Sequence, residues 1–513
     1  MERDTPYSPR QRTALVLTGT GTAGAYHAGV LRALHEAGVK LDIVCGRGMG
    51  AVGALFTAID AAARLWEPNG LWLGKPFLRG LYEWRLVWRV AGWALVAACV
   101  ALFLPIAVLA VGAIVYPVLL LFELVAPSSG AALTLQLTST LSSWFSGGLL
   151  SALVSRLATA ALLVFVATLA VSFAAEHLRR PRRRTRGAPW WQALGSPMST
   201  SRAIAWATGG FWSFVHGATP LPQPPRDELS RRYGELLGEN LGQPGYRELI
   251  IAAHNLETRR DLVFALIAKE NRTRFFGAHS GELDPGRGAE LVDLAGTGRD
   301  HVMDAIGAAL AVPMLTEPHL LTFGTDTFWR GETHRLCDRP AALVRLLEEA
   351  SAAGAEQVIL VSPDAPLDRA HALSARQVDP RALLADWLAG AETAATRDAL
   401  TALFDRFSGV FQIQPAHNPI GPFAFAGAYD ERSDRVQPLK ELMDRGYEDA
   451  YRQFIEPVVG ASGEQLEREP APSSRVTPQP PGRHTPSSPS ASGSGSAADD
   501  DRTSISAMLA NLE

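Results

Sequence analysis

The sequence has few cysteines, little charge and no recognisable metal-binding motif. Its 513 residues include three cysteines, Cys45, Cys99 and Cys337, an odd number that excludes a fully paired disulfide framework and a four-cysteine zinc site. No H-E-x-x-H or C-x-x-C motif occurs, and the histidines are scattered, so we expect neither a metal nor another cofactor. The net charge of −4 gives no electrostatic reason to expect a nucleic-acid partner.

Charged residues make up only 19% of the chain, and two long stretches are almost free of them. Residues 90–124 carry a single charge, Glu123, and residues 157–175 carry none. A bilayer span needs about 20 apolar residues, so both stretches are long enough or nearly so. Arginines flank the outer end of each stretch, and the positive-inside tendency therefore places both ends in the cytoplasm. The sequence predicts a multi-pass membrane protein with a two-span hairpin over residues 84–178 and a cytoplasmic soluble domain.

Two other interpretations of these stretches remain open at this point. They could form a buried helical pair in a soluble core, although soluble helices rarely run this long without a polar face. Pro105 and Pro117 could also kink the first stretch and produce a re-entrant hairpin. The polar N-terminus lacks the apolar core of a secretory signal, so we do not expect export by that route.

The N-terminal region alternates short apolar runs with glycine-rich turns and helical patterns. Residues 13–18 read as a buried strand, followed by the loop GTGTAG and an amphipathic helix that ends near Gly38. Residues 41–45 read as the next strand, followed by the turn GRGMG and a helix rich in small residues. This β-α-β-α order is typical of a parallel sheet covered by helices.

The two glycine turns allow three interpretations. Gly19, Gly21 and Gly24 fit the G-x-G-x-x-G fingerprint of dinucleotide sites, but the acidic residue, Asp42, begins the second strand instead of following it. Alternatively, the first turn offers backbone N–H groups to an oxyanion and the second is a nucleophile elbow, with Gly46 and Gly50 relieving its crowding. The third interpretation is two ordinary strand-to-helix turns.

Several segments in order resemble the patatin-like phospholipases. They are GTGTAGAYHAGVLRAL, LDIVCGRGMGAVGAL, YRELIIAAHNLETRRDLVF, DAIGAALAVPML, FWRGETHRLCDRPAALVRLLEEASAAGAEQVILVS and RGYEDAYRQFI. The resemblance implies a three-layer α/β/α fold and a Ser–Asp dyad that hydrolyses lipid acyl esters, with Gly19, Gly21 and Gly24 in its oxyanion loop. It divides the patatin-like domain into parts at residues 12–66 and 245–460, separated by the hairpin and a juxtamembrane linker at 179–244.

The chain departs from the pattern of that family at both dyad positions. The elbow of the family reads G-x-S-x-G, and here Gly48 stands at the nucleophile position between Gly46 and Gly50. Arg330 precedes Gly331, where the family has its catalytic aspartate. Asp326 and Asp338 lie near enough in sequence to approach the site, although neither is followed by glycine. Loss of the nucleophile alone typically costs about 10⁴–10⁶ in turnover, so we expect no useful hydrolysis through this dyad.

The sequence therefore favours a pseudoenzyme that binds or senses membrane lipids, with Arg330 and the glycine loop holding a carboxylate or phosphate head group. One alternative is an active lipid acyl hydrolase with a non-standard nucleophile. Another is a membrane adaptor that presents its C-terminal tail to a protein partner. That tail is predicted to be disordered over residues 463–503, which hold almost no bulky apolar residue, and to end in an amphipathic helix at 504–513.

Overall fold

A computed structural model of the chain describes most of its residues. The described residues are 7–73, 81–146, 148–179, 195–217, 221–277, 287, 289–325, 327–365, 380–425, 427–430, 433 and 435–460. The predicted disordered segment 463–503 and the predicted terminal helix 504–513 lie outside them.

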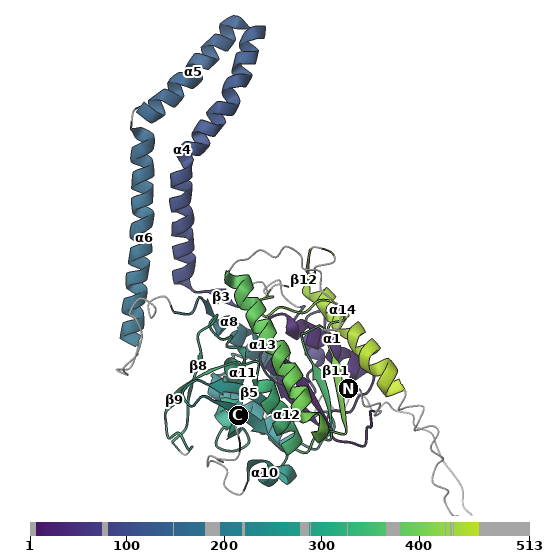
Figure 1. Cartoon of the computed structure of the whole chain (residues 1–513). Coiled ribbons are helices and arrows are strands. Elements are labelled where there is room, and N and C mark those ends of the chain that lie inside the picture. Colours follow the sequence, from purple (N-terminus) through teal and green to yellow (C-terminus); the bar gives the residue numbers. More distant parts are fainter. Residues whose placement is uncertain are drawn as a thin grey trace, which may run out of the picture. The chain divides into compact units, whose positions relative to one another are not determined.

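A mixed, largely parallel sheet forms the centre of the soluble part (Figure 1). Its strands, in spatial order, are β11 (Gly409–Ile413), β10 (Gln357–Val361), β1 (Thr13–Leu17), β2 (Ile43–Gly46), β5 (Glu248–Asn255), β6 (Arg260–Leu266) and β7 (Ala289–Asp293). The strands from β11 to β5 run parallel, and β6 turns back antiparallel to β5. A short hairpin of β8 (His319–Thr322) and β9 (Thr333–Cys337) joins the sheet through β5.

Side chains of the central strands point alternately into two hydrophobic cores, one on each face of the sheet. In β1, Leu15 and Leu17 belong to one core, while Ala14 and Val16 belong to the other. The first core is completed by α1 (Ala23–Glu36), α2 (Gly50–Ala58), α8 (Ser201–Val215), α9 (Arg226–Asn240), α11 (Val302–Leu310) and α14 (Leu439–Ala450). The second contains residues of α10 (Lys269–Phe276), α12 (Ala342–Ala352) and α13 (Pro380–Leu403). The predicted α/β/α architecture is therefore confirmed.

The predicted linker at 179–244 is more structured than expected. Its α8 and α9 contribute fully or almost fully buried side chains to the first core, including Phe211 and Tyr233. The Tyr233 hydroxyl also donates a 2.7 Å hydrogen bond to the Leu55 carbonyl of α2. One buried stripe of side chains is enough to hold a helix on a domain, so a helix of low apolar content such as α9 can still pack against the core. Its composition alone does not indicate this packing.

The insertion between the two parts of the domain is helical throughout its described residues. It consists of α4 (Leu86–Val125), α5 (Pro127–Ser146) and α6 (Leu149–Arg179), and α4 packs against both of the others (Figure 1). Two of these helices, α4 and α6, contain windows long and apolar enough to cross a membrane, and those windows are 11% and 0% buried. This exposure contradicts the alternative of a buried pair in a soluble core. At 1.5 Å per residue, the 40 residues of α4 extend about 60 Å, roughly twice the hydrocarbon thickness of a bilayer.

The remaining described elements are short. They are α3 (Ala63–Trp66), β3 (Glu83–Trp84), β4 (Met198–Ser199), η2 (Arg299–His301), η3 (Phe404–Arg406), β12 (Ala428–Asp430), β13 (Arg435–Gln437) and η4 (Tyr451–Val459). The β3–β4 pair joins the chain just before α4 to the chain just before α8. Both ends of the insertion are therefore held together by backbone hydrogen bonds.

Candidate active site

A sharp turn joins the carboxyl end of β2 to α2 and places Gly48 at its apex. Gly48 has a φ of +56°, in the left-handed region that costs other residues about 1–2 kcal/mol. Glycines two residues before and after it lie against backbone. A Cβ on Gly46 would lie 2.6 Å from the Ala51 Cα, and a Cβ on Gly50 would lie 2.2 Å from the Leu17 carbonyl oxygen. The turn thus has the tight strand-to-helix geometry of a nucleophile elbow, without a nucleophilic side chain.

The carbonyl oxygen of Gly19 occupies the space beside Gly48. A Cβ on Gly48 would lie 2.3 Å from this oxygen, far inside van der Waals contact. The same oxygen accepts a 2.8 Å hydrogen bond from the Met49 N–H. In hydrolases with this elbow, the N–H that follows the nucleophile stabilises the oxyanion. Here that N–H is already hydrogen-bonded to a carbonyl of the glycine loop. The loop and the elbow therefore use each other's backbone hydrogen-bonding groups.

A second segment covers the glycine loop from outside. The Thr22 N–H donates to the Ala424 carbonyl at 2.9 Å, and the Thr20 hydroxyl donates to the Pro422 carbonyl at 3.0 Å. A Cβ on Gly21 would lie 2.9 Å from the Ala424 carbonyl oxygen. Every residue of the loop and the elbow, from 18 to 24 and from 43 to 50, is buried. The segment around Ala424 therefore covers the glycine loop.

Gly24, the third glycine of the loop, lies one residue inside α1 and faces aromatic packing. A Cβ there would lie 2.2 Å from the indole ring of Trp72 and 2.6 Å from Met49. Gly24 therefore allows α1 to approach the start of α2 closely. Its role in the structure is packing, whereas a Cβ on Gly21 would meet a backbone carbonyl and one on Gly19 would meet the side chains of Ala23 and Pro363.

Of the two aspartates near the acid position, Asp338 faces the elbow, whereas Asp326 lies outside the described residues. One carboxylate oxygen of Asp338 lies 3.2 Å from the position of a Cβ on Gly48. Arg330 is exposed, at a φ of +37° in the turn between β8 and β9. The seven residues between Arg330 and Asp338 include all of β9, which carries the chain from this turn to the elbow. Arg330 and Asp338 thus lie at opposite ends of β9, and only Asp338 lies beside the elbow.

Arg47, the residue between the two elbow positions Gly46 and Gly48, forms a buried ionic cluster with Asp338 and Glu392. Its side chain is 1% exposed. The guanidinium donates to Glu392 Oε1 at 2.9 Å and to Asp338 Oδ2 at 3.5 Å. A third carboxylate, Asp364, lies close enough to raise the pKa of Arg47 together with the other two, against the opposing effect of burial. The space beside the elbow is therefore occupied by charged side chains that are already paired with one another.

Burial dominates the protonation of these carboxylates. It raises the pKa of Glu392 from its ordinary value of 4.5 to about 7, although Arg47 opposes the shift. It also raises the pKa of Asp338 and of Asp364, against Arg47 and hydrogen-bond donors. One guanidinium cannot hold three ionised carboxylates in a low-dielectric site. The cluster therefore takes up protons near neutral pH.

Other buried polar atoms around the elbow have no hydrogen-bond partner within the described part of the chain. They are Arg47 Nε, Asp338 Oδ1 and Thr22 Oγ1. Burial lowers the pKa of His27 to about 4, so its imidazole is neutral at physiological pH. Each buried unpaired polar group costs about 1–3 kcal/mol, a cost that a more hydrated arrangement would avoid.

Replacement of Glu392 by glutamine is expected to flatten the pH dependence of stability. The folded protein holds a proton on Glu392 that the unfolded chain releases between pH 4.5 and about 7. Ionisation in the fold therefore lowers stability as pH rises, by up to about 3 kcal/mol for a shift of this size. The variant Glu392→Gln keeps a hydrogen bond to Arg47 and should gain melting temperature over wild type at about pH 8 but not at about pH 5. Glu441→Gln, at an exposed pair with Arg435, is the control. An equal gain at both pH values would contradict the prediction.

Comparison with known proteins agrees with this geometry. The family model described as patatin-like phospholipase matches residues 15–338, more than half of the chain. The chain belongs to the patatin-like phospholipase family. The match begins in β1 and ends at Asp338, so it includes the glycine loop, the elbow and the carboxylate that faces it.

Individual relatives match only a short stretch of this patatin-like protein. Triacylglycerol lipase ptl3 of Schizosaccharomyces pombe is 49% identical over 47 residues, which are 9% of this chain and 10% of the lipase. Patatin-like phospholipase domain-containing protein 6 of Homo sapiens is 50% identical over 52 residues, which are 10% of this chain and 4% of that protein. The crystal structure of VipD from Legionella pneumophila aligns with 88% of this chain and 67% of its own at 12% identity, with a TM-score of 0.29. The chain thus spans a tenth or less of the length of these curated relatives.

Proposed function

We propose that this patatin-like protein binds or senses membrane lipids without hydrolysing them. The single observation that carries the proposal is the state of the elbow, where Gly48 offers no nucleophile and the Gly19 carbonyl takes the place of its side chain. The Met49 N–H is already hydrogen-bonded to that carbonyl, so it is not free to stabilise an oxyanion. The carboxylate beside the elbow, Asp338, is paired with Arg47 and has no hydroxyl to activate. These features support a role in lipid binding or sensing, at a site other than the elbow.

The proposal includes anchoring in a bilayer through α4 and α6. Their exposed apolar windows support this role, and the short β3–β4 pairing supports a hairpin whose ends emerge together on one side of the membrane. By the positive-inside tendency that side is the cytoplasm. Patatin-like relatives with lipase and phospholipase in their names make lipid the expected ligand class. The exposed position of Arg330 argues against the head-group role that the sequence suggested for it.

The alternative of an active hydrolase needs another nucleophile near the elbow. Cys45 is the nearest thiol in sequence, but it is fully buried in β2, and burial raises its pKa so that it stays protonated. Only a thiolate would attack an ester at a useful rate. The Thr20 hydroxyl donates to a backbone carbonyl, and the described residues place no base beside it that would activate it.

The adaptor alternative depends on the C-terminal tail, which lies outside the described residues.

Phospholipid hydrolysis by the full chain in lipid nanodiscs tests the non-catalytic proposal. We expect no release of fatty acid above a heat-denatured control, and none from the variant Gly48→Ser. The serine Cβ would meet the Gly19 carbonyl, so the new hydroxyl has no room for an acyl ester beside it. Gly48→Ala serves as the matched control, because it adds the same Cβ without a hydroxyl. Hydrolysis by the unmodified chain would overturn the proposal, whereas hydrolysis by Gly48→Ser alone would show that the loop opens.

Cys99 provides a natural reporter for the membrane anchor. It lies in α4 with its side chain exposed, whereas Cys45 and Cys337 are buried in the domain. In reconstituted vesicles, we expect a membrane-impermeant maleimide to leave Cys99 unmodified until detergent is added. The variant Cys99→Ser identifies the labelled site. Labelling of Cys99 in intact vesicles would contradict the proposed span.

A further inference from the structure

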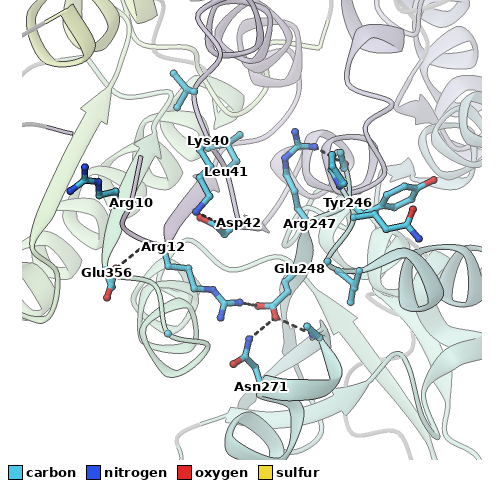
Figure 2. A pocket seen from close by; sticks show the side chains of 18 of the residues that line it. Arg10, Arg12, Lys40, Leu41, Asp42, Tyr246, Arg247, Glu248, Asn271 and Glu356 are labelled. Carbon is cyan, nitrogen blue, oxygen red and sulfur yellow. Dashed lines mark hydrogen bonds and ion pairs between the residues drawn. The ribbon is translucent and has the colours of Figure 1, made fainter. Parts of the chain in front are cut away.

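A charged pocket lies at the amino ends of the central strands, at the edge of the sheet opposite the elbow. Its volume is about 790 Å³, and Figure 2 shows the side chains that line it. The residues at its base include Arg12, which precedes β1, Asp42, which precedes β2, and Glu248, which begins β5. The elbow follows the carboxyl end of β2, so the length of the strands separates the two sites. The pocket is therefore independent of the lost catalytic centre.

Positive side chains outnumber negative ones around the pocket. The five cations are Arg10, Arg12, Lys40, Arg247 and Arg274, and the three carboxylates are Asp42, Glu248 and Glu356. This imbalance leaves an excess of two positive charges facing one cavity. Like charges gathered around a cavity create a local potential that attracts anions.

Donors of the protein itself already engage the three carboxylates. Glu248 accepts hydrogen bonds from the Arg12 guanidinium at 2.5 Å, from the Ala268 N–H at 3.0 Å and from Asn271 at 3.2 Å (Figure 2). Asp42 accepts from the Thr13 N–H and pairs with Lys40, and Glu356 accepts from the Arg12 N–H. The groups of the pocket that can still form hydrogen bonds to a ligand are therefore mainly N–H donors.

The side chains of two pocket arginines, Arg10 and Arg274, have no ion pair or hydrogen bond within the described part of the chain. Arg274 also faces Arg12 across Gly354, which has a φ of +91° and no side chain to fill the gap. A Cβ on Gly354 would lie 3.3 Å from Arg274 Nη2 and 3.8 Å from Arg12 Nη1. Two guanidinium groups therefore lie close together beside Gly354, one of them also bonded to Glu248. An anion held in the pocket between Arg274 and Arg12 would receive charge-assisted hydrogen bonds from both.

We propose that this pocket binds a phosphate-bearing anion, with Arg274 and Arg12 as a bidentate clamp and Arg10 as a further donor. Guanidinium groups match the oxygens of phosphate in shape and charge, and a monoester carries close to two negative charges, which balances the excess of the pocket. The same chemistry is offered by a soluble phosphate ester and by the head group of an anionic phospholipid. The site would give the protein an anion-dependent function that does not require the elbow.

Binding measurements on the full chain in phosphatidylcholine nanodiscs test the proposal. In the first arm, calorimetry follows titration with inorganic phosphate and with glycerol 3-phosphate. In the second, the nanodiscs contain phosphatidic acid, and its effect on the melting temperature is recorded. The variants are Arg274→Gln and Arg10→Gln, and the matched control is Arg330→Gln, which removes another exposed arginine that does not line the pocket.

We expect Arg274→Gln to weaken phosphate binding about tenfold, as loss of a charge-assisted hydrogen bond would, and Arg330→Gln to leave it unchanged. A response in the soluble arm identifies a free phosphate ester as the ligand, and a response confined to phosphatidic acid identifies the lipid head group. No response in either arm, or equal losses in Arg274→Gln and Arg330→Gln, would overturn the proposal. Because none of these measurements involves ester hydrolysis, failure here would leave the proposed function standing.

Discussion

Replacement of Arg47 by methionine is expected to destabilise the domain by about 3–5 kcal/mol, enough to abolish folding in many single-domain proteins. Arg47 carries the positive charge of a buried cluster in which Asp338 and Glu392 are 2% and 8% exposed. Methionine fills much of the same volume but leaves both carboxylates without a counter-ion. They must then either stay charged in a low-dielectric site or take up protons at the expense of folding free energy.

The pH dependence of Arg47→Met distinguishes this electrostatic cause from a packing defect. Protonation neutralises the abandoned carboxylates, so the deficit in melting temperature should shrink between about pH 8 and about pH 5. A triple variant that combines Arg47→Met with Asp338→Asn and Glu392→Gln removes the charges together and should recover much of the loss. A deficit that is the same at both pH values and persists in the triple variant would contradict the electrostatic explanation.

The second large effect is expected at the elbow, where Gly50→Ala should destabilise the domain by about 3 kcal/mol, at the upper end of the cost of overpacking. The new Cβ would lie 2.2 Å from the carbonyl oxygen of Leu17 and 2.5 Å from its carbonyl carbon. Both atoms belong to the backbone of β1, which is paired on both sides by β2 and β10. Relief of the clash would require α2 to move away from the sheet.

Gly53→Ala in the same helix is the matched control for Gly50→Ala. Its Cβ would meet only the ends of flexible side chains, Leu17 Cδ1 at 2.8 Å and Leu31 Cδ1 at 3.8 Å. A gain of about 1 kcal/mol in helix propensity offsets the small rearrangement. Chemical denaturation of the two variants should separate them clearly. Equal stabilities would mean that the contact between α2 and β1 is looser than the structure indicates.

The architecture of the domain was predictable because its signals are local. Buried strands ending in glycine turns, followed by helices rich in small residues, indicate a covered parallel sheet from composition and order alone. The long apolar helices were equally clear, because few charges interrupt them. In contrast, α9 was missed as part of the core. Its polar composition concealed the buried stripe of Leu229, Tyr233 and Leu237, which only the tertiary packing reveals.

The composition of the site was harder to predict than the fold. The absence of a serine at Gly48 is visible in the sequence, but its consequence for the Gly19 carbonyl depends on how two turns meet. The resemblance places the acid position at Arg330, which is exposed, and spacing alone does not reveal that β9 also brings Asp338 to the elbow. The sequence contains one sign of the ionic cluster. Arg47 is a charged residue in the turn between an apolar strand and an apolar helix. Such a charge requires a buried carboxylate, but its partner Glu392 lies 345 residues away and could not be identified from spacing.

Fluorophosphonate labelling of the unmodified full chain, mapped by mass spectrometry, tests the central claim most directly. This probe reacts with activated hydroxyl groups and needs no knowledge of the natural lipid. With Gly48 at the apex and the Met49 N–H already paired, we predict no adduct on residues 12–66 or on any other hydroxyl above a denatured control. A stoichiometric adduct on Thr20, Thr22 or another serine or threonine would reveal a working nucleophile, and the non-catalytic account would then be wrong.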